Sequence, residues 1–157
     1  MSASARLAEL GIELPDVVPP VASYVPAVQL GALVYTSGQL PLSGGALVHT
    51  GKVGEGAGLV SETDATAAAR VAALNAVAAA ASLAGGVDRI ARVVKVVGFV
   101  ASDPSFTGQP RVINGASNLL QEIFGDAGVH ARSAVGVAVL PLDAPVEVEL
   151  IVEVTTP

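Results

Sequence analysis

The longest helical pattern of hydrophobic and polar positions lies between Ser61 and Ala84. Apolar residues recur there at three- and four-residue spacing, as on the buried face of a helix; they are Val71, Leu74, Val77, Ala78 and Ala81. Ser61 with Asp64 resembles a capping box at the start, and Gly85 with Gly86 provides a stop. The pattern predicts a helix over residues 61–84.

A second apolar stripe predicts a helix from about Pro110 to Phe124. Its members are Val112, Ala116, Leu119, Leu120 and Ile123. Proline suits the first turn of a helix, and Gly125 follows the last periodic residue. A short helix is also expected over Ser4–Leu10, ended by Gly11.

Runs rich in apolar and β-branched residues predict the strands. They are residues 25–30 and 32–36, which meet at Gly31, then 46–49, 92–101, 133–140 and 146–154. The last two are joined by the turn-like sequence LPLDAP, which predicts a hairpin. The order β-β-β-α-β-α-β-β predicts an α+β fold, with a mixed sheet of about six strands and two helices packed on one face. Residues 1–20 are expected to be an N-terminal extension, and residues 21–157 a single domain.

The distribution of apolar residues in the strands predicts an oligomer. In the strand over 92–101, simple alternation places Val93, Val97 and Phe99 on one face and Val94, Val96 and Val100 on the other. A strand that is apolar on both faces is normally buried on both, whereas two helices cover only one face of a sheet. The final strand instead has valines and a leucine on one face and Glu147, Glu149, Ile151 and Glu153 on the other. We therefore expect the second face of the sheet to pack against other subunits.

Composition and charge narrow the functional classes. The chain is 52% hydrophobic and 14% charged, and its 8 basic and 14 acidic residues give a net charge of −6. No cluster of Lys or Arg is present, so nucleic acid is not an expected partner. With no cysteine in the chain, disulfides, thiolate metal sites and a Cys nucleophile are excluded. The N-terminus has no apolar core of signal-peptide length, and the apolar stretch 65–86 is mostly alanine, so we expect a soluble, cytoplasmic protein with no membrane partner.

Two charged residues are candidates for chemistry. Arg132 stands at the start of a strand whose same side continues with small residues, and its guanidinium is suited to two-point binding of a carboxylate. Glu147 begins the final strand on the face away from the helices, where a carboxylate can orient water. From spacing alone, a solvated or ion-paired strand-end arginine and a solubilising glutamate remain alternatives. His49 and His130 have no neighbouring acidic or histidine cluster in the sequence, so a solvated or structural role is expected for both and no metal site is expected.

Two segments resemble the RidA family (the YjgF/YER057c/UK114 group). They are SYVPAVQLGALVYTSGQLP and HARSAVGVAVLPLDAPVEVEL, which flank the two helices in this order. The most specific features are SGQ at 37–39, ARS at 131–133, the following LP and the V-E-V-E strand. The resemblance extends from about Tyr24 to Val154.

The resemblance implies a chorismate-mutase-like fold assembled as a homotrimer, with sheets inward and helices outside. It implies intersubunit clefts that bind small carboxylates, with Arg132 holding the substrate carboxylate and Glu147 associated with the attacking water. Tyr24, Ser37, Gly38 and Asn114 match further cleft positions, and Ala134 stands where many relatives have cysteine.

Characterised relatives hydrolyse enamine and imine intermediates such as 2-aminoacrylate to 2-keto acids and ammonia. The function expected from the resemblance is therefore an imine deaminase that needs no metal or organic cofactor. The alternative is a non-catalytic trimer that binds a small carboxylate or imine metabolite and modulates a partner enzyme. An endoribonuclease, an older label of the family, is disfavoured by the net charge of −6.

Overall fold

A five-stranded mixed sheet forms the centre of the computed structural model, which describes residues 1–20 and 22–155. The strand order is β1-β2-β7-β5-β6. The strands are β1 (Ala27–Leu30), β2 (Leu33–Thr36), β5 (Ile90–Ala101), β6 (Ala131–Val137) and β7 (Val146–Val154). Only β5 and β6 pair in parallel; the other neighbours are antiparallel. The expected domain limits at Val21 and Pro157 lie outside the described residues.

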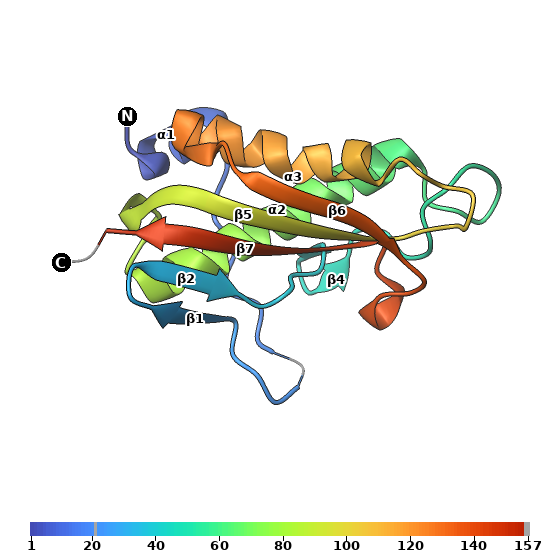
Figure 1. Ribbon diagram of the computed structural model, residues 1–157, viewed down its shortest axis with the longest axis horizontal. Helices are drawn as coiled ribbons and strands as arrows, with labels where there is room; N and C mark the ends of the chain where they lie inside the picture. The colour runs from blue at the N-terminus through green and yellow to red at the C-terminus, as the bar shows by residue number, and fades with distance from the viewer. Residues whose placement is uncertain (21, 156–157) are drawn as a thin grey trace.

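The helices α2 (Glu62–Ala84) and α3 (Gln109–Phe124) lie together against one face of this sheet (Figure 1). Ser61 Oγ accepts a hydrogen bond from the Asp64 backbone N–H at 3.1 Å, and Gly85 ends α2 with a left-handed φ of 88°. The third helix, α1 (Ala3–Leu10), packs on the end of α3. The two long helices and their placement on one face confirm the prediction.

The core is built from small side chains at close approach. Most alanines of α2 are fully buried, and the helix packs against α3 and β7. α2 is also long and apolar enough to cross a membrane, but 61% of its apolar window is buried inside the fold. It is therefore packed as the central helix of the core.

The sheet has five strands, so the prediction of about six is wrong in detail. The residues expected to form a third strand contribute only β4 (Ala46–Leu47), which pairs with β3 (Leu42–Ser43) in a separate hairpin. Gly44 and Gly45, both at positive φ, turn the chain after two residues, and Pro41 lacks an N–H for a ladder. This hairpin is too short to join the main sheet.

The predicted hairpin of the last two strands is also wrong. β5 lies between β6 and β7, in parallel with β6 and antiparallel to β7. The connection from β5 to β6 passes through α3, and a crossover helix is the usual way to bring two strands parallel. The segment after β6 therefore passes over the end of β5 before β7 begins.

Simple alternation also assigned the faces of β5 wrongly. Register shifts between Ile90 and Arg92 and between Val93 and Lys95 change the phase of the strand. As a result Val93, Val96 and Val100 are all fully buried toward the helices. Val97 and Phe99 are half-buried on the opposite, open face.

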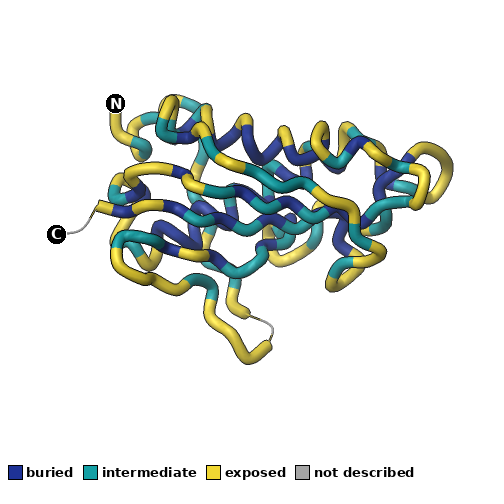
Figure 2. Tube along the Cα trace, in the orientation of Figure 1, coloured by how far each residue is buried: buried dark blue, intermediate teal, exposed yellow. Residues whose placement is uncertain are grey.

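The open face of the sheet carries exposed apolar residues. Figure 2 shows that β1 and β6 are mostly exposed or half-buried along the chain. Val28, Leu30, Tyr35 and Val135 are its large exposed apolar members. No helix covers this face within the described chain. The expectation that other subunits cover it stays a prediction.

Candidate functional site

Arg132 lies on the edge strand β6, with its side chain on the helix face. It is paired with Val96, which is fully buried toward the helices, and residues paired across a ladder share a face. Its Nη1 donates to Asn114 Oδ1 at 2.8 Å and to Ser117 Oγ at 3.1 Å, and its Nη2 donates to the Pro110 carbonyl at 3.2 Å. The structure thus brings together two predicted site residues, Arg132 and Asn114.

These contacts leave part of the Arg132 guanidinium available. A guanidinium has five N–H donors, and three are used by α3. Nε–H and one N–H of Nη2 have no partner among the residues described. Nε and Nη2 share one edge of the planar group, and such an edge can receive a carboxylate in two parallel hydrogen bonds.

Ala134 lies beside this arginine on the same face of β6. It is paired with Gly98, where an added Cβ would lie 2.5 Å from the Ile113 side chain. The next residue on this face is Gly136, so no bulky side chain of β6 follows Arg132. We call Arg132, Asn114, Ser117 and Ala134 the arginine group.

Glu147 lies on the opposite face of the sheet, at the start of β7. It is paired with Phe99 and is half-buried on the open face. An added Cβ at Gly38 would lie 1.8 Å from Glu147 Oε1, so only glycine allows this carboxylate to lie where it does. Gly38 and Glu147 are therefore in direct contact.

Ser37 links this region to the segment before β1. Its Oγ donates to the Val25 carbonyl at 2.6 Å, and its backbone N–H donates to the Pro26 carbonyl at 2.8 Å. Tyr24, the residue before Val25, is 46% exposed. Glu147, Gly38, Ser37 and Tyr24 form a second set, which we call the glutamate group.

The environment of Glu147 favours its protonated form. Removal from water raises the pKa of its carboxyl, and the negative charge of Glu149, two residues along the same face, raises that pKa further. A carboxyl with a raised pKa can exchange protons closer to neutral pH than an ordinary glutamate can.

One chain does not combine the two groups. Arg132 is level with Val96 and Glu147 with Phe99, so they are offset by three residues of β5, roughly 10 Å along the strand. A hairpin with Leu140 opposite Val146, as the sequence predicts, would separate Arg132 from Glu147 by seven residues, roughly 24 Å. The observed strand order corrects this offset. Their side chains nevertheless project from opposite faces of the sheet, so they cannot both contact one small molecule.

Sequence reasoning missed the contacts behind Arg132. Ser117 follows Asn114 by three residues on α3, which places both on one side of the helix and was a usable signal. His130 Nε2 lies 2.8 Å from Ser117 Oγ, and Nδ1 lies 2.6 Å from the Gly128 carbonyl oxygen. Its structural role agrees with the expectation from the sequence. His49 is 3.9 Å from Asp64 at a partly exposed position.

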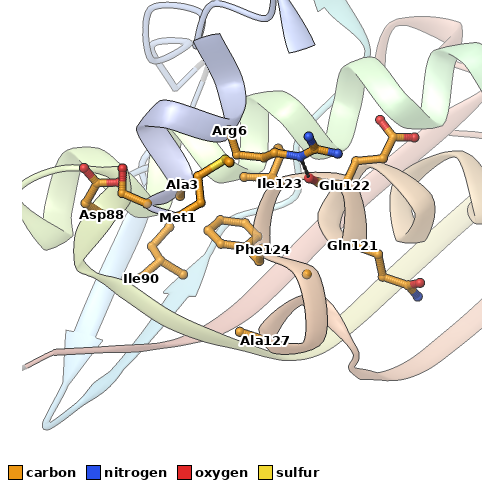
Figure 3. A pocket seen from close by; sticks show the side chains of 12 residues that line it. Met1, Ala3, Arg6, Asp88, Ile90, Gln121, Glu122, Ile123, Phe124 and Ala127 are labelled. Carbon is orange, nitrogen blue, oxygen red and sulfur yellow. Dashed lines mark hydrogen bonds between the residues drawn. The ribbon is translucent and has the colours of Figure 1, made fainter. Parts of the chain in front are cut away.

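Two cavities among the described residues lie away from both groups. One of about 540 Å³ opens between α1 and the end of α3 and includes Arg6, Asp88, Glu122 and Phe124 in its lining (Figure 3). Arg6 Nε donates there to the Glu122 carbonyl at 2.9 Å. Another cavity, of about 560 Å³, lies between residues 13–19 and α2. Neither is lined by any of the seven predicted site residues.

Comparison with known proteins decides the family. The family described as "YjgF/chorismate mutase-like, putative endoribonuclease" matches residues 4–154. The chain belongs to this YjgF family. Protein TCP17 of Trypanosoma cruzi is 45% identical over 151 residues, covering 96% of this chain and 92% of that protein. The family and the chorismate-mutase-like fold predicted from the sequence are confirmed.

Solved structures of similar proteins share the fold. Atu1372 of Agrobacterium tumefaciens is 45% identical, with a TM-score of 0.86 over 98% of this chain and 92% of that chain. A Shewanella oneidensis protein described as a putative endoribonuclease is 34% identical, with a TM-score of 0.92 over 98% and 100%. Escherichia coli TdcF, solved with bound serine, is 25% identical, with a TM-score of 0.63 over 89% and 94%.

Proposed function

We propose that this YjgF-family protein hydrolyses small amino-acid-derived enamines and imines, of the 2-aminoacrylate type, to 2-keto acids and ammonia. The observation that carries the proposal is the Arg132 guanidinium, which α3 holds by three hydrogen bonds while Nε–H and one Nη2 N–H stay available. A planar donor edge held in this way suits the carboxylate that such substrates share. TdcF, whose structure contains bound serine, is a relative with an amino acid as ligand.

The chemistry requires little beyond positioning and proton transfer. An enamine such as 2-aminoacrylate first becomes the imine, because its methylene carbon gains a proton and its nitrogen loses one. The carbon of the C=N bond is electrophilic, so water can add to it and form a carbinolamine. The C–N bond then breaks, the nitrogen leaves as ammonia after gaining a proton, and the carbonyl of the keto acid forms. A carboxyl such as Glu147, with its raised pKa, can orient the water, accept its proton and return a proton to the leaving nitrogen.

We further propose that the site forms between chains of a homotrimer. Arg132 and Glu147 project from opposite faces of one sheet, so a shared ligand needs the arginine group of one chain and the glutamate group of a neighbour. Arg132 stands on an edge strand, and the open face beside Glu147 exposes apolar residues that such packing would cover. Three equivalent clefts would result.

An RNA substrate is not supported by the charges. The chain carries −6, and Arg6, Arg70 and Arg111 are each paired with a glutamate. Affinity for RNA comes largely from basic groups that meet the phosphates. The family description therefore does not lead us to propose nuclease activity for this chain.

The proposal is tested by generating 2-aminoacrylate or 2-iminobutanoate with a dehydratase and following the decay of the imine. We expect the protein to accelerate decay, Arg132→Ala to lose at least about 100-fold in kcat/KM, and Arg132→Lys to recover little of it, because an ammonium lacks the planar two-point contact. Arg70→Ala, which removes an ion pair with Glu122 on the helices, is the matched control and should retain activity. No acceleration by the intact protein, with 2-keto acids still bound, would favour the non-catalytic binding protein instead.

A further inference from the structure

A chain of hydrogen bonds extends behind Arg132, away from its available edge. Arg132 Nη1 contacts Ser117 Oγ at 3.1 Å, Ser117 Oγ contacts His130 Nε2 at 2.8 Å, and His130 Nδ1 contacts the Gly128 carbonyl at 2.6 Å. Ser117 is 7% exposed, so this chain is largely shielded from water. It connects three successive elements: α3, the 3-10 helix η2 (Gly125–Gly128) and β6.

Counting donors and acceptors fixes the direction of this chain. A guanidinium only donates and a carbonyl oxygen only accepts, so Arg132 donates to Ser117 and His130 Nδ1 carries a proton toward Gly128. Ser117 accepts from Arg132 and has one hydroxyl proton of its own. In neutral His130, Nε2 is then the acceptor of the hydrogen bond from the Ser117 hydroxyl. Every hydrogen bond of this chain is therefore donated in the direction from Arg132 to Gly128.

The far end of the chain is fixed by backbone packing. An added Cβ at Gly128 would lie 2.3 Å from the Leu120 carbonyl oxygen, so η2 is pressed against the backbone of α3. The Gly128 carbonyl is therefore a rigid acceptor, and it sets the plane of the His130 ring. His130 in turn sets the rotamer of the Ser117 hydroxyl.

We propose that Ser117 and His130 are positioning residues that hold the Arg132 guanidinium in the plane in which its Nε/Nη2 edge faces the substrate carboxylate. The inference rests on the proposed function for what is bound, and on the hydrogen-bond chain alone for the orientation. Without Ser117, α3 would hold the guanidinium only through Asn114 on Nη1 and through the 3.2 Å hydrogen bond from Nη2 to the Pro110 carbonyl, and both contacts lie at exposed positions. The guanidinium would then rotate among several orientations, and fewer of them would present both donors to a ligand.

The orientation is tested without any ligand. The ¹⁵N relaxation of the Arg132 side-chain Nε–H, assigned by its loss in Arg132→Lys, reports how rigidly the guanidinium is held. We expect an ordered Nε–H in the intact protein, and a clearly more mobile one in Ser117→Ala and His130→Leu. His130→Gln, whose amide oxygen can replace Nε2 as acceptor, should restore order. Asn118→Ala, at an exposed position next to Ser117, is the matched control and should change nothing.

The consequence for binding is measured with 2-oxobutanoate and with the imine assay. We expect Ser117→Ala and His130→Leu to weaken 2-oxobutanoate binding and to raise KM about 5- to 20-fold. The kcat of both variants should change less than about 3-fold. His130→Gln should recover most of the affinity. An unchanged Arg132 order in both broken variants, or a loosened guanidinium with unchanged affinity, would overturn the proposal. If the intact protein neither binds the keto acid nor hydrolyses imines, the proposed function fails, and the relaxation data alone decide whether Ser117 and His130 position Arg132.

Discussion

Gly38 is a residue whose missing side chain defines the position of a functional group. A methyl group there would lie 1.8 Å from Glu147 Oε1, although the backbone of Gly38 is not in the left-handed region. We expect Gly38→Ala to fold normally and to lose at least about 10-fold in kcat/KM, because the carboxylate must turn away.

The matched control for Gly38→Ala is Gly44→Ala. Gly44 has open space around it but a φ of 60°, so alanine there should lower the free energy of unfolding by about 1 kcal/mol and leave kcat/KM unchanged. Urea unfolding and the imine assay on both variants check the two effects. A Gly38→Ala protein with full activity would show that Glu147 does not act from its observed position.

Glu147 also predicts how activity depends on pH. Because burial and Glu149 raise its pKa, Glu147 keeps its proton to higher pH than an ordinary glutamate does. If Glu147 acts as the base, kcat/KM falls on the acid side over a range above the usual glutamate pKa. Glu149→Gln removes one of the two causes, so we expect this acid limb to move to lower pH. A pH profile that is the same for both proteins would exclude the influence of Glu149 on the reacting group.

The raised pKa of Glu147 also determines how its contribution to stability changes with pH. A folded-state pKa above the unfolded one means that the contribution of Glu147 is most favourable below the unfolded pKa and is lost as pH rises through the folded pKa. Glu147→Gln should therefore raise the free energy of unfolding most near neutral pH and least in acid.

At the scale of elements, the close contact of α2 with α3 depends on Gly115. An added Cβ there would lie 2.0 Å from the Thr66 carbonyl oxygen of α2. Alanine has the higher helix propensity by about 1 kcal/mol, but two helix backbones would have to separate to admit it. We expect Gly115→Ala to lower the free energy of unfolding by about 2 kcal/mol, measured in urea. Asn118→Ala, on the exposed side of the same helix, should be neutral or slightly stabilising.

Helices and strands differed in how well the sequence predicted them. α2 and α3 were placed to within one residue, because their ends are marked locally by Ser61, Pro110 and Gly125. The faces of β5 were wrong because its bulges leave no mark in the alternation of valines. The pairing of β6 with β5 rather than with β7 depends on contacts between residues far apart in the sequence, which local patterns do not show. The helix between β5 and β6 was nevertheless a signal for a parallel crossover.

The candidate site shows the same limit. Arg132 and Glu147 could be selected from the sequence, because they are charged residues at strand starts that match a family pattern. Their offset along the sheet depends on the strand order, which the hairpin assumption missed, whereas alternation along the two strands already placed them on opposite faces. Ser117 was missed, and for His130 only a solvated or structural role was expected, because a hydroxyl and an imidazole become informative only when their distances to a third group are known.

At the scale of the whole molecule, the separation of the two groups makes a quantitative prediction for mixed assemblies. In the proposed cyclic trimer, each cleft contains Arg132 from one chain and Glu147 from the next. A trimer that contains both Arg132→Ala and Glu147→Ala chains then has one cleft in which both residues are intact, whichever variant is present twice. Each variant alone has none. Mixed trimers should therefore recover about one third of the activity of the unmodified protein.

A second mixture separates this arrangement from a site within one chain. This mixture contains one unmodified chain and two chains that carry both Arg132→Ala and Glu147→Ala. Such a trimer has no complete intersubunit cleft, so it should be inactive. If the site lay within one chain, the trimer would retain about one third of the activity. The trimers are prepared by co-expression with two different affinity tags, purified in sequence on both, and checked for chain ratio by native mass spectrometry. Activity in the first mixture and its absence in the second would establish the shared cleft. The reverse result would place the whole site in one chain, and a monomer in the native spectrum would exclude the assembly on which the proposal depends.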